Sequence, residues 1–556
     1  MKKICSILLS LVLSVAAFSF VGCKPSVPDT PETLEVYVYE AGYGTQWCKD
    51  LLNLFKKKDW VKEKYPNLII PTPVTNDVSD FAETKLNGGK KGNTFDLMFA
   101  TNLEYFIGPN GNFLDLTDVV YNSQVPGENV LWKDKSLESY NETNTYIDPT
   151  DLSSRRQYLT SWAGGMNSIL YNEDLLLKFT DKVPNTTDEL LAVCEAVRTN
   201  TDKTKYSDNY SFISYSGGSY MENLFEIWWA QYEGVQGFKN FWNGIDGNRY
   251  SSDIFKQKGR LYGLQVLEEI LDGNRCTKEE EEKGKYPSYV NRDATTLEFM
   301  QAQTLFLQGH GLFHCNGDWF ENEMSNIRNQ IIEREGSIDT FKTMRVPILS
   351  KIGVKLGITD AELSAIVDYV DGTTTVEPEF TSTEGLTKQE VIDAVREART
   401  IVHSIGTYHE AGIPVYAEGK EVAVDFLRLM ATDEALECYI NATKGASLPF
   451  KYNLKEKNMT LYNSLGTLQQ SRHDYFDTDA YEVYTLPTKR GFPLYRYGGV
   501  RPFVRESYYT DLFAKNKVWT AKEVDDSDKV KNYYDETIKT WTDVKWANAL
   551  RLSGLG

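Results

Sequence analysis

Hydrophobic and polar residues first alternate and then take helical spacing where the folded part of the chain is expected to begin. Residues 34–39 (LEVYVY) alternate as a strand does, and a glycine-rich loop follows at 40–44. Apolar residues in 47–60 have helical spacing, and further strands are predicted at 67–71 and 94–100. This strand–helix–strand order predicts a parallel sheet, in which ligands lie beyond the carboxyl ends of the strands.

The α/β pattern continues through the middle of the chain. Residues 158–171 run into a helix, and Thr186 with Glu189 forms a capping box that opens another. Residues 302–319 (AQTLFLQGHGLFHCNGDW) predict a helix end, a turn, a short strand and a tight polar loop. A strong helix is predicted at 421–440, and polar segments near 278–292 and at 352–402 are interpreted as inserts.

The N-terminus has the pattern of an export signal. Two lysines precede an apolar stretch at 4–20, and the sequence Phe-Val-Gly-Cys at 20–23 resembles a bacterial lipobox. Residues 1–22 are therefore expected to be a lipoprotein signal peptide, with Cys23 lipidated and 23–33 acting as a tether at the outer face of the cell membrane. The alternative is a plain cleaved signal with an incidental cysteine.

The composition is that of a large acidic globular protein. Its 556 residues are about twice what one hydrophobic core usually supports, so two or more lobes are expected. A mean hydropathy of −0.43 excludes a polytopic membrane protein, and a net charge of −19 argues against a nucleic-acid partner. Setting Cys5 and Cys23 aside leaves five distant cysteines without CxxC spacing, which excludes a dense disulfide framework or a thiolate zinc cluster.

Seven segments between residues 34 and 449, taken in order, resemble the extracellular solute-binding proteins of sugar ABC importers, the family of maltose-binding protein. They are the first strand with its loop, FDLMFATN, the 162–171 stretch with LYNED, VPNTTDELL, GLFHCNGDW, MRVPIL, and AGIPVYAEGKEVAVDFL with GASLP. The resemblance implies an α/β, two-lobed periplasmic-binding-protein fold (type II), with a ligand cleft between lobes joined by crossing hinge strands. The expected lobes are 34–158 with 347–446, and 159–346 with 447–556, the latter including C-terminal helices.

The same resemblance implies a binding function. The protein would capture a carbohydrate, expected to be an oligosaccharide, by lobe closure, and would deliver it to ABC permease subunits served by a cytoplasmic ATPase. It is expected to act as a monomer, to need no cofactor, and to contact the membrane through its lipid anchor alone.

Eight residues are candidate ligand contacts, because sugars need aromatic platforms and a few fixed polar groups. The family places a stacking aromatic at Trp319, and Asp318 beside it could accept hydroxyl hydrogen bonds or merely fix the turn. Trp229 belongs to an apolar helical stripe that is also typical of a core. The others follow predicted strands or lie at the lobe crossing, where turn or hinge roles are the alternative: Glu40, Tyr43, Asn102, Glu104 and Trp162.

Catalytic functions are the main alternatives to binding. A lipid-anchored glycoside hydrolase would need a carboxylate pair, which Asp318 could form with Glu321 or Glu323. His310 and His314 could align on a metal only in a helix, and the flanking glycines favour a turn and a strand, so no metal site is expected. A third hypothesis keeps the binding fold but replaces the sugar with a peptide or another small solute.

Overall fold

The computed structural model describes most of the chain after its N-terminal region. The described residues are 32–78, 80–200, 210–215, 220–271, 276–282, 288–477, 482–486, 492–500 and 529–556. The expected signal peptide, Cys23 and all but the last residues of the expected tether lie outside these ranges. Within them, no helix combines the length and apolar character needed to cross a bilayer.

The first lobe is built on a five-stranded mixed sheet. Its strand order is β2 (Val74–Asn76), β1 (Val36–Tyr39), β3 (Leu97–Thr101), β14 (His409–Gly412) and β6 (Thr160–Ser161). β1 pairs in parallel with β2 and β3, whereas β14 runs antiparallel to β3 and β6. The predicted strands at 34–39 and 94–100 are thus confirmed. The strand predicted at 67–71 was wrong, because that segment makes only an isolated bridge and the neighbouring strand is β2.

The second lobe is built on a sheet centred on β7 (Met166–Asn172). Side chains alternate across β7, so Ile169 and Tyr171 face one layer of helices and Leu170 faces the other. The first layer includes α10 (Met221–Asn243) and α11 (Lys258–Leu271), and the second includes α13 (Phe299–Leu307) and α14 (Phe320–Glu335). The strands in order are β15 (Tyr484–Thr485), β13 (Ile401–Ser404), β7, β11 (Gly311–Gly317) and β8 (Tyr210–Ile213), with β12 (Phe341–Met344) also on β7.

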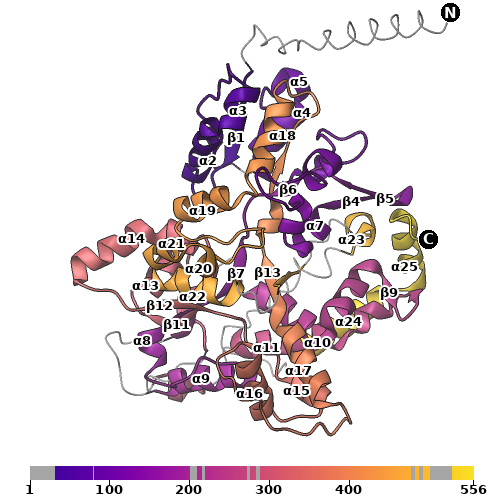
Figure 1. The fold of residues 1–556 in the computed structure, drawn as a ribbon. Coiled ribbons are helices and arrows are strands. Elements are labelled where there is room, and N and C mark those ends of the chain that lie inside the picture. Colours follow the sequence, from indigo (N-terminus) through magenta and orange to yellow (C-terminus); the bar gives the residue numbers. More distant parts are fainter. Residues whose placement is uncertain are drawn as a thin grey trace, which may run out of the picture.

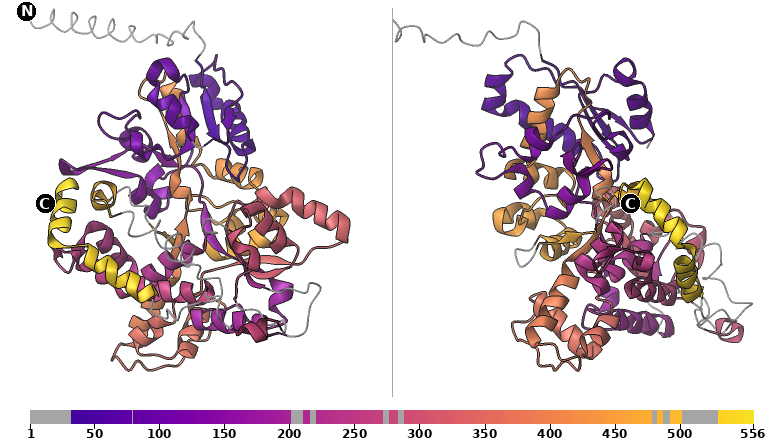
Figure 2. Two further views of the ribbon diagram at one scale, coloured as in Figure 1. Left: turned by 180° about the vertical axis from the view of Figure 1, so that it is seen from behind. Right: turned by 90° about the vertical axis from the view of Figure 1, so that its right-hand side faces the viewer.

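The chain passes between the two lobes in crossing segments that form a waist between the upper and lower parts of the molecule (Figure 2). It crosses from β6 to β7 through residues 162–165 and returns from β13 to β14 through 405–408. A third crossing follows 449–451, which pair with residues 135–137 of the first lobe before α22 (Thr467–Phe476) packs on the second. The architecture is the expected two-lobed α/β fold with crossing segments.

The expected lobe boundary at residue 347 was wrong. Three helices that follow it join the core of the second lobe: two of them pack against α10 and the third packs on those two, as Figure 1 shows at the bottom of the molecule. The physical reason is that each helix presents one apolar stripe, which needs a partner surface, and that surface belongs to the second core. These helices are α15 (Lys351–Leu356), α16 (Asp360–Val370) and α17 (Lys388–Thr400).

The C-terminal helices also pack on the second lobe. They are α23 (Pro493–Tyr497), α24 (Lys529–Thr540) and α25 (Asp543–Leu552). Val530, Trp541 and Trp546 join the same hydrophobic cluster as α10 and α11.

Candidate ligand-binding site

A buried carboxylate at the end of β11 connects the two lobes. Asp318 is only 3% exposed. Its Oδ1 accepts a 2.8 Å hydrogen bond from the hydroxyl of Tyr43, which lies in the loop after β1. Its Oδ2 accepts hydrogen bonds from the hydroxyl and, at 2.6 Å, the backbone N–H of Ser447. Asp318 therefore ties the second lobe to the first lobe and to the third crossing.

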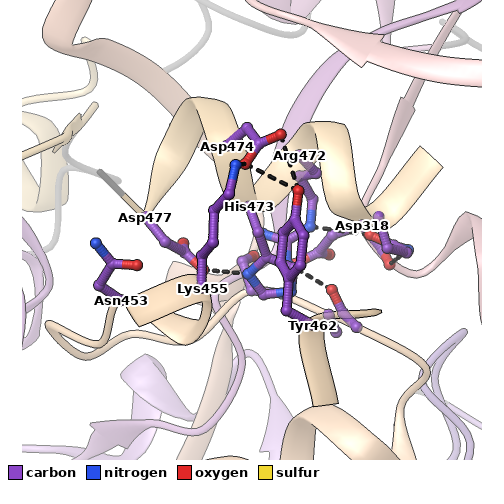
Figure 3. Close-up of polar contacts among 12 residues, drawn as sticks. Asp318, Asn453, Lys455, Tyr462, Arg472, His473, Asp474 and Asp477 are labelled. Atoms are coloured by element: carbon purple, nitrogen blue, oxygen red, sulfur yellow. Dashed lines mark hydrogen bonds and ion pairs between the residues drawn. The ribbon is translucent and has the colours of Figure 1, made fainter. Parts of the chain in front are cut away.

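The surroundings of Asp318 act on its pKa in opposite directions. Burial raises the pKa, while the charge of Arg472 and the hydrogen bonds from Ser447 and Tyr43 lower it. Gln469 of α22 donates to the Asp318 backbone carbonyl at 3.1 Å and accepts from Arg472 Nε at 2.9 Å, so α22 is hydrogen-bonded to the turn. Figure 3 shows Arg472 of α22 beside Asp318. Both carboxylate oxygens thus have protein donors, as expected of a residue that fixes a turn.

Trp319 lies directly at the contact between the lobes. Its indole is 5% exposed and packs edge-on against Tyr43, with ring centres 6.1 Å apart, and against Tyr220, at 5.3 Å. Gly42 and Gly317 make room for it: a Cβ at Gly42 would lie 2.8 Å from the indole, and one at Gly317 would lie 2.0 Å from it. Two glycines from different lobes therefore permit this packing.

Trp162, at the first crossing, packs between a helix and a strand of the first lobe. Its ring stacks with Trp47 of α2 (Gln46–Lys57) at 4.7 Å and with His409 of β14 at 4.9 Å. Its indole N–H and the Nδ1 of His409 are buried without a hydrogen-bond partner among the described residues. The stacking supports the hinge-packing role that was the alternative for Trp162, because two protein rings already stack on it.

The polar candidates of the first lobe gather at one edge of its sheet. Glu40 is exposed just beyond β1, and Asn102 is exposed just beyond β3, with a left-handed φ of 60°. Glu104 follows, and its backbone carbonyl accepts a 2.8 Å hydrogen bond from Arg496 of α23. This edge also carries Tyr43, so the four first-lobe positions that follow strands share the side that faces the second lobe.

The prediction that Trp229 contacts the ligand was wrong. It lies fully buried in the core of the second lobe, where its ring packs against Phe225, Phe238 and Phe241. Its indole N–H donates to Gln257 at 2.8 Å. The helical stripe seen in the sequence is a core stripe, which was the competing interpretation.

Three residues at the lobe contact were missed by the sequence analysis. Tyr220, with a positive φ of 56°, begins α10 and packs on the clusters of both lobes. Asn223 follows within the first turn and is buried. Burial lowers the pKa of His409 to about 4, so this ring is neutral near pH 7. No motif marks these positions, since their significance depends on which segments meet at the waist.

The proposed catalytic carboxylates have other partners. Glu321 forms an ion pair with Arg328 at 2.7 Å, and Glu323 accepts from Gln303 at 2.9 Å. Burial raises the pKa of both groups. Two residues apart on α14, they point to different sides of the helix, so they do not face a common bond with Asp318.

His314 lies in β11 rather than in a helix, so it does not align with His310 as two metal ligands would. Its Nδ1 is 2.9 Å from the Ile213 carbonyl and its Nε2 is 3.1 Å from the Asn316 amide. Burial lowers the pKa of His314 to about 4. Across the described part of the chain, no cluster of three or more His, Cys, Asp or Glu residues has the geometry of a metal site.

Comparison with solved structures supports the fold. A protein whose description concerns xylan utilization by the thermophilic bacterium Caldanaerobius polysaccharolyticus aligns with a TM-score of 0.53 at 14% identity. The alignment covers 92% of this chain and 100% of that protein. The apo form of RafE from Streptococcus pneumoniae aligns with a TM-score of 0.50 at 12% identity, covering 95% and 98%. No family model and no curated protein matches the sequence. The chain therefore has the two-lobed fold of solute-binding proteins.

Proposed function

We propose that this protein is a lipid-anchored solute-binding protein that captures a carbohydrate between its lobes and delivers it to an ABC importer. The observation that carries the proposal is the aromatic group at the lobe contact, formed by Trp319, Tyr220 and Tyr43. Aromatic faces complement the apolar faces of sugar rings, and a site formed from two lobes couples binding to lobe closure. RafE, which shares the fold, is described as a solute-binding protein in complex with raffinose.

The test is calorimetric titration of the chain lacking its first 33 residues with mono- and oligosaccharides. Saturable binding at micromolar or lower concentration, with the sugar recovered intact, is the expected result. Binding of a peptide or another solute alone would refute the carbohydrate assignment. New reducing ends during incubation would indicate a glycoside hydrolase instead.

Anchoring and transport complete the proposal. Cys23 would carry the lipid at the outer face of the bacterial cell membrane, and residues 24–33 would connect it to the folded lobes. The liganded protein would then dock as a monomer on two permease subunits powered by a cytoplasmic ATPase. Deleting the permease genes should abolish uptake of the bound sugar while leaving binding to the purified protein unchanged.

A further inference from the structure

The first turn of α10 carries a polar side chain that the proposed binding role does not yet use. Asn223 is 2% exposed, and neither its amide oxygen nor its amide nitrogen has a hydrogen-bond partner among the described residues. A buried amide without partners is costly, and such groups in folded proteins usually have a functional explanation.

Asn223 lies on α10 between the aromatic contact at the waist and the strand that leads into the second crossing. Its backbone N–H donates to the carbonyl of Tyr220 at 3.0 Å, and the Tyr220 ring packs on Trp319. One helical turn further, Glu226 lies on the same face of α10 as Asn223. Glu226 Oε2 is 3.7 Å from Nε2 of His403, in the strand that leads into the second crossing. Asn223 is therefore aligned with the aromatic contact on one side and the crossing strand on the other.

The hydrogen bonds around His403 extend this polar line. Asn167 Nδ2 lies 2.9 Å from His403 Nδ1, so the ring accepts there and carries its proton on Nε2, toward Glu226. The amide oxygen of Asn167 is also buried without a partner among the described residues. The Asn223 amide offers donors and an acceptor, and the Asn167 amide oxygen offers a second acceptor. This combination matches hydroxyl groups, which both donate and accept hydrogen bonds. The nearby carboxylate of Glu226 disfavours an anionic solute.

We propose that Asn223 binds hydroxyl groups of a neutral polyhydroxylated ligand whose ring rests on the adjacent Tyr220 and Trp319. The assignment rests on the proposed function, because it identifies a contact within the same site. Asn223 would set which hydroxyls are recognised, while the rings supply apolar contact area.

Replacing the Asn223 amide with an apolar side chain of similar size tests whether Asn223 contacts the ligand or stabilises the fold. Asn223→Leu should weaken binding of the best sugar about tenfold or more, which is 1.4 kcal/mol. It should leave the thermal midpoint of the unliganded protein unchanged or raised, because no protein hydrogen bond is lost. The matched control is Asn185→Leu, since Asn185 donates to Asp368 at 2.7 Å and to Ser364 O at 3.1 Å. That variant should lower the midpoint and leave affinity unchanged.

Deoxy sugars identify the hydroxyls. One deoxy analogue should bind the wild type less tightly than the parent sugar, and the difference should disappear in Asn223→Leu and in the smaller Asn223→Ala. Wild-type affinity and an unchanged deoxy profile in both variants would overturn the role of Asn223 alone. If the wild type binds none of the sugars, both the proposed function and this inference are refuted.

Discussion

The hydrogen bond between Tyr43 and Asp318 should control how readily the lobes separate. Tyr43 belongs to the first lobe and Asp318 to the second, and the 2.8 Å bond between them is buried. The substitution Tyr43→Phe removes the hydroxyl but keeps the ring that packs on Trp162, Trp319 and His409. The change therefore acts on one hydrogen bond that joins the lobes, with little loss of packing.

The size of the effect follows from the type of bond. A hydrogen bond to a charged group contributes about 1.5–3 kcal/mol, and Asp318 would keep its two donors from Ser447. Losing this contribution would shift the balance between joined and separated lobes about 10- to 100-fold toward separation. Apparent ligand affinity falls in proportion to the fraction of molecules that can close. Removing the Tyr43 hydroxyl also raises the pKa of Asp318 further, because that bond lowers it.

Small-angle scattering and calorimetry measure the two consequences. Unliganded Tyr43→Phe should have a larger radius of gyration than the wild type, and it should bind ligand less tightly. The control is Tyr65→Phe, because the Tyr65 hydroxyl donates to Asp425 at 2.7 Å entirely within the first lobe. That control should lose stability without a change in radius or affinity. An unchanged radius and affinity in Tyr43→Phe would refute the role of this bond in holding the lobes together.

Three further predictions follow from burial and packing. Trp319→Ala should weaken sugar binding by about 2 kcal/mol or more. Trp229→Ala should instead lower the unfolding free energy by about 3–5 kcal/mol with no loss of affinity. Calorimetric titration and urea unfolding measure both quantities, and a loss of affinity in Trp229→Ala but not in Trp319→Ala would contradict the site. As pH falls from about 6.5 to 4, His409 binds a proton in the unfolded chain but not in the folded one, so the unfolding free energy should drop by up to about 3 kcal/mol. The unfolding free energy of His409→Phe should drop less over that range. An equal drop in the variant would show that His409 is not the source of the pH dependence. Cys23→Ser should move the protein from the membrane fraction to the soluble fraction, and retention in membranes would refute lipid anchoring.

Sequence patterns predicted the strands with long buried faces better than the edges of the sheet. The alternation at 34–39 and the apolar run at 94–100 correspond to β1 and β3, which are central and buried. The edge strand β2 has three residues, two of them exposed and one partly buried, so no hydrophobic pattern distinguishes it from a loop. The segment 67–71 carried more apolar residues and was predicted in its place.

Lobe membership and site membership depend on contacts between distant residues. Residues 352–402 were interpreted as a polar insert, although Thr359 with Glu362 and Thr387 with Glu390 form the capping boxes that open two of its helices. The apolar faces of these helices could have matched either core, and only their packing in the folded chain places them in the second lobe. Trp319 and Trp229 were both candidate ligand contacts, and their surroundings separate them, because Trp319 lies at the waist and Trp229 lies inside a core.

The contacts that join the lobes suggest how opening can occur at modest cost. On the side of α23, Arg496 donates to the Glu104 carbonyl and lies 5.3 Å from the ring centre of Tyr146, both in the first lobe. The ion pair between Lys239 and Glu142 is partly exposed, and such pairs contribute about 0–1 kcal/mol. Burial of the Trp319 ring is the largest single apolar contribution among these contacts, at roughly 2–3 kcal/mol for a large side chain. A ligand that covers this ring can therefore replace the main apolar contact that the lobes lose when they separate, and the polar cost that remains is chiefly the buried bond between Tyr43 and Asp318.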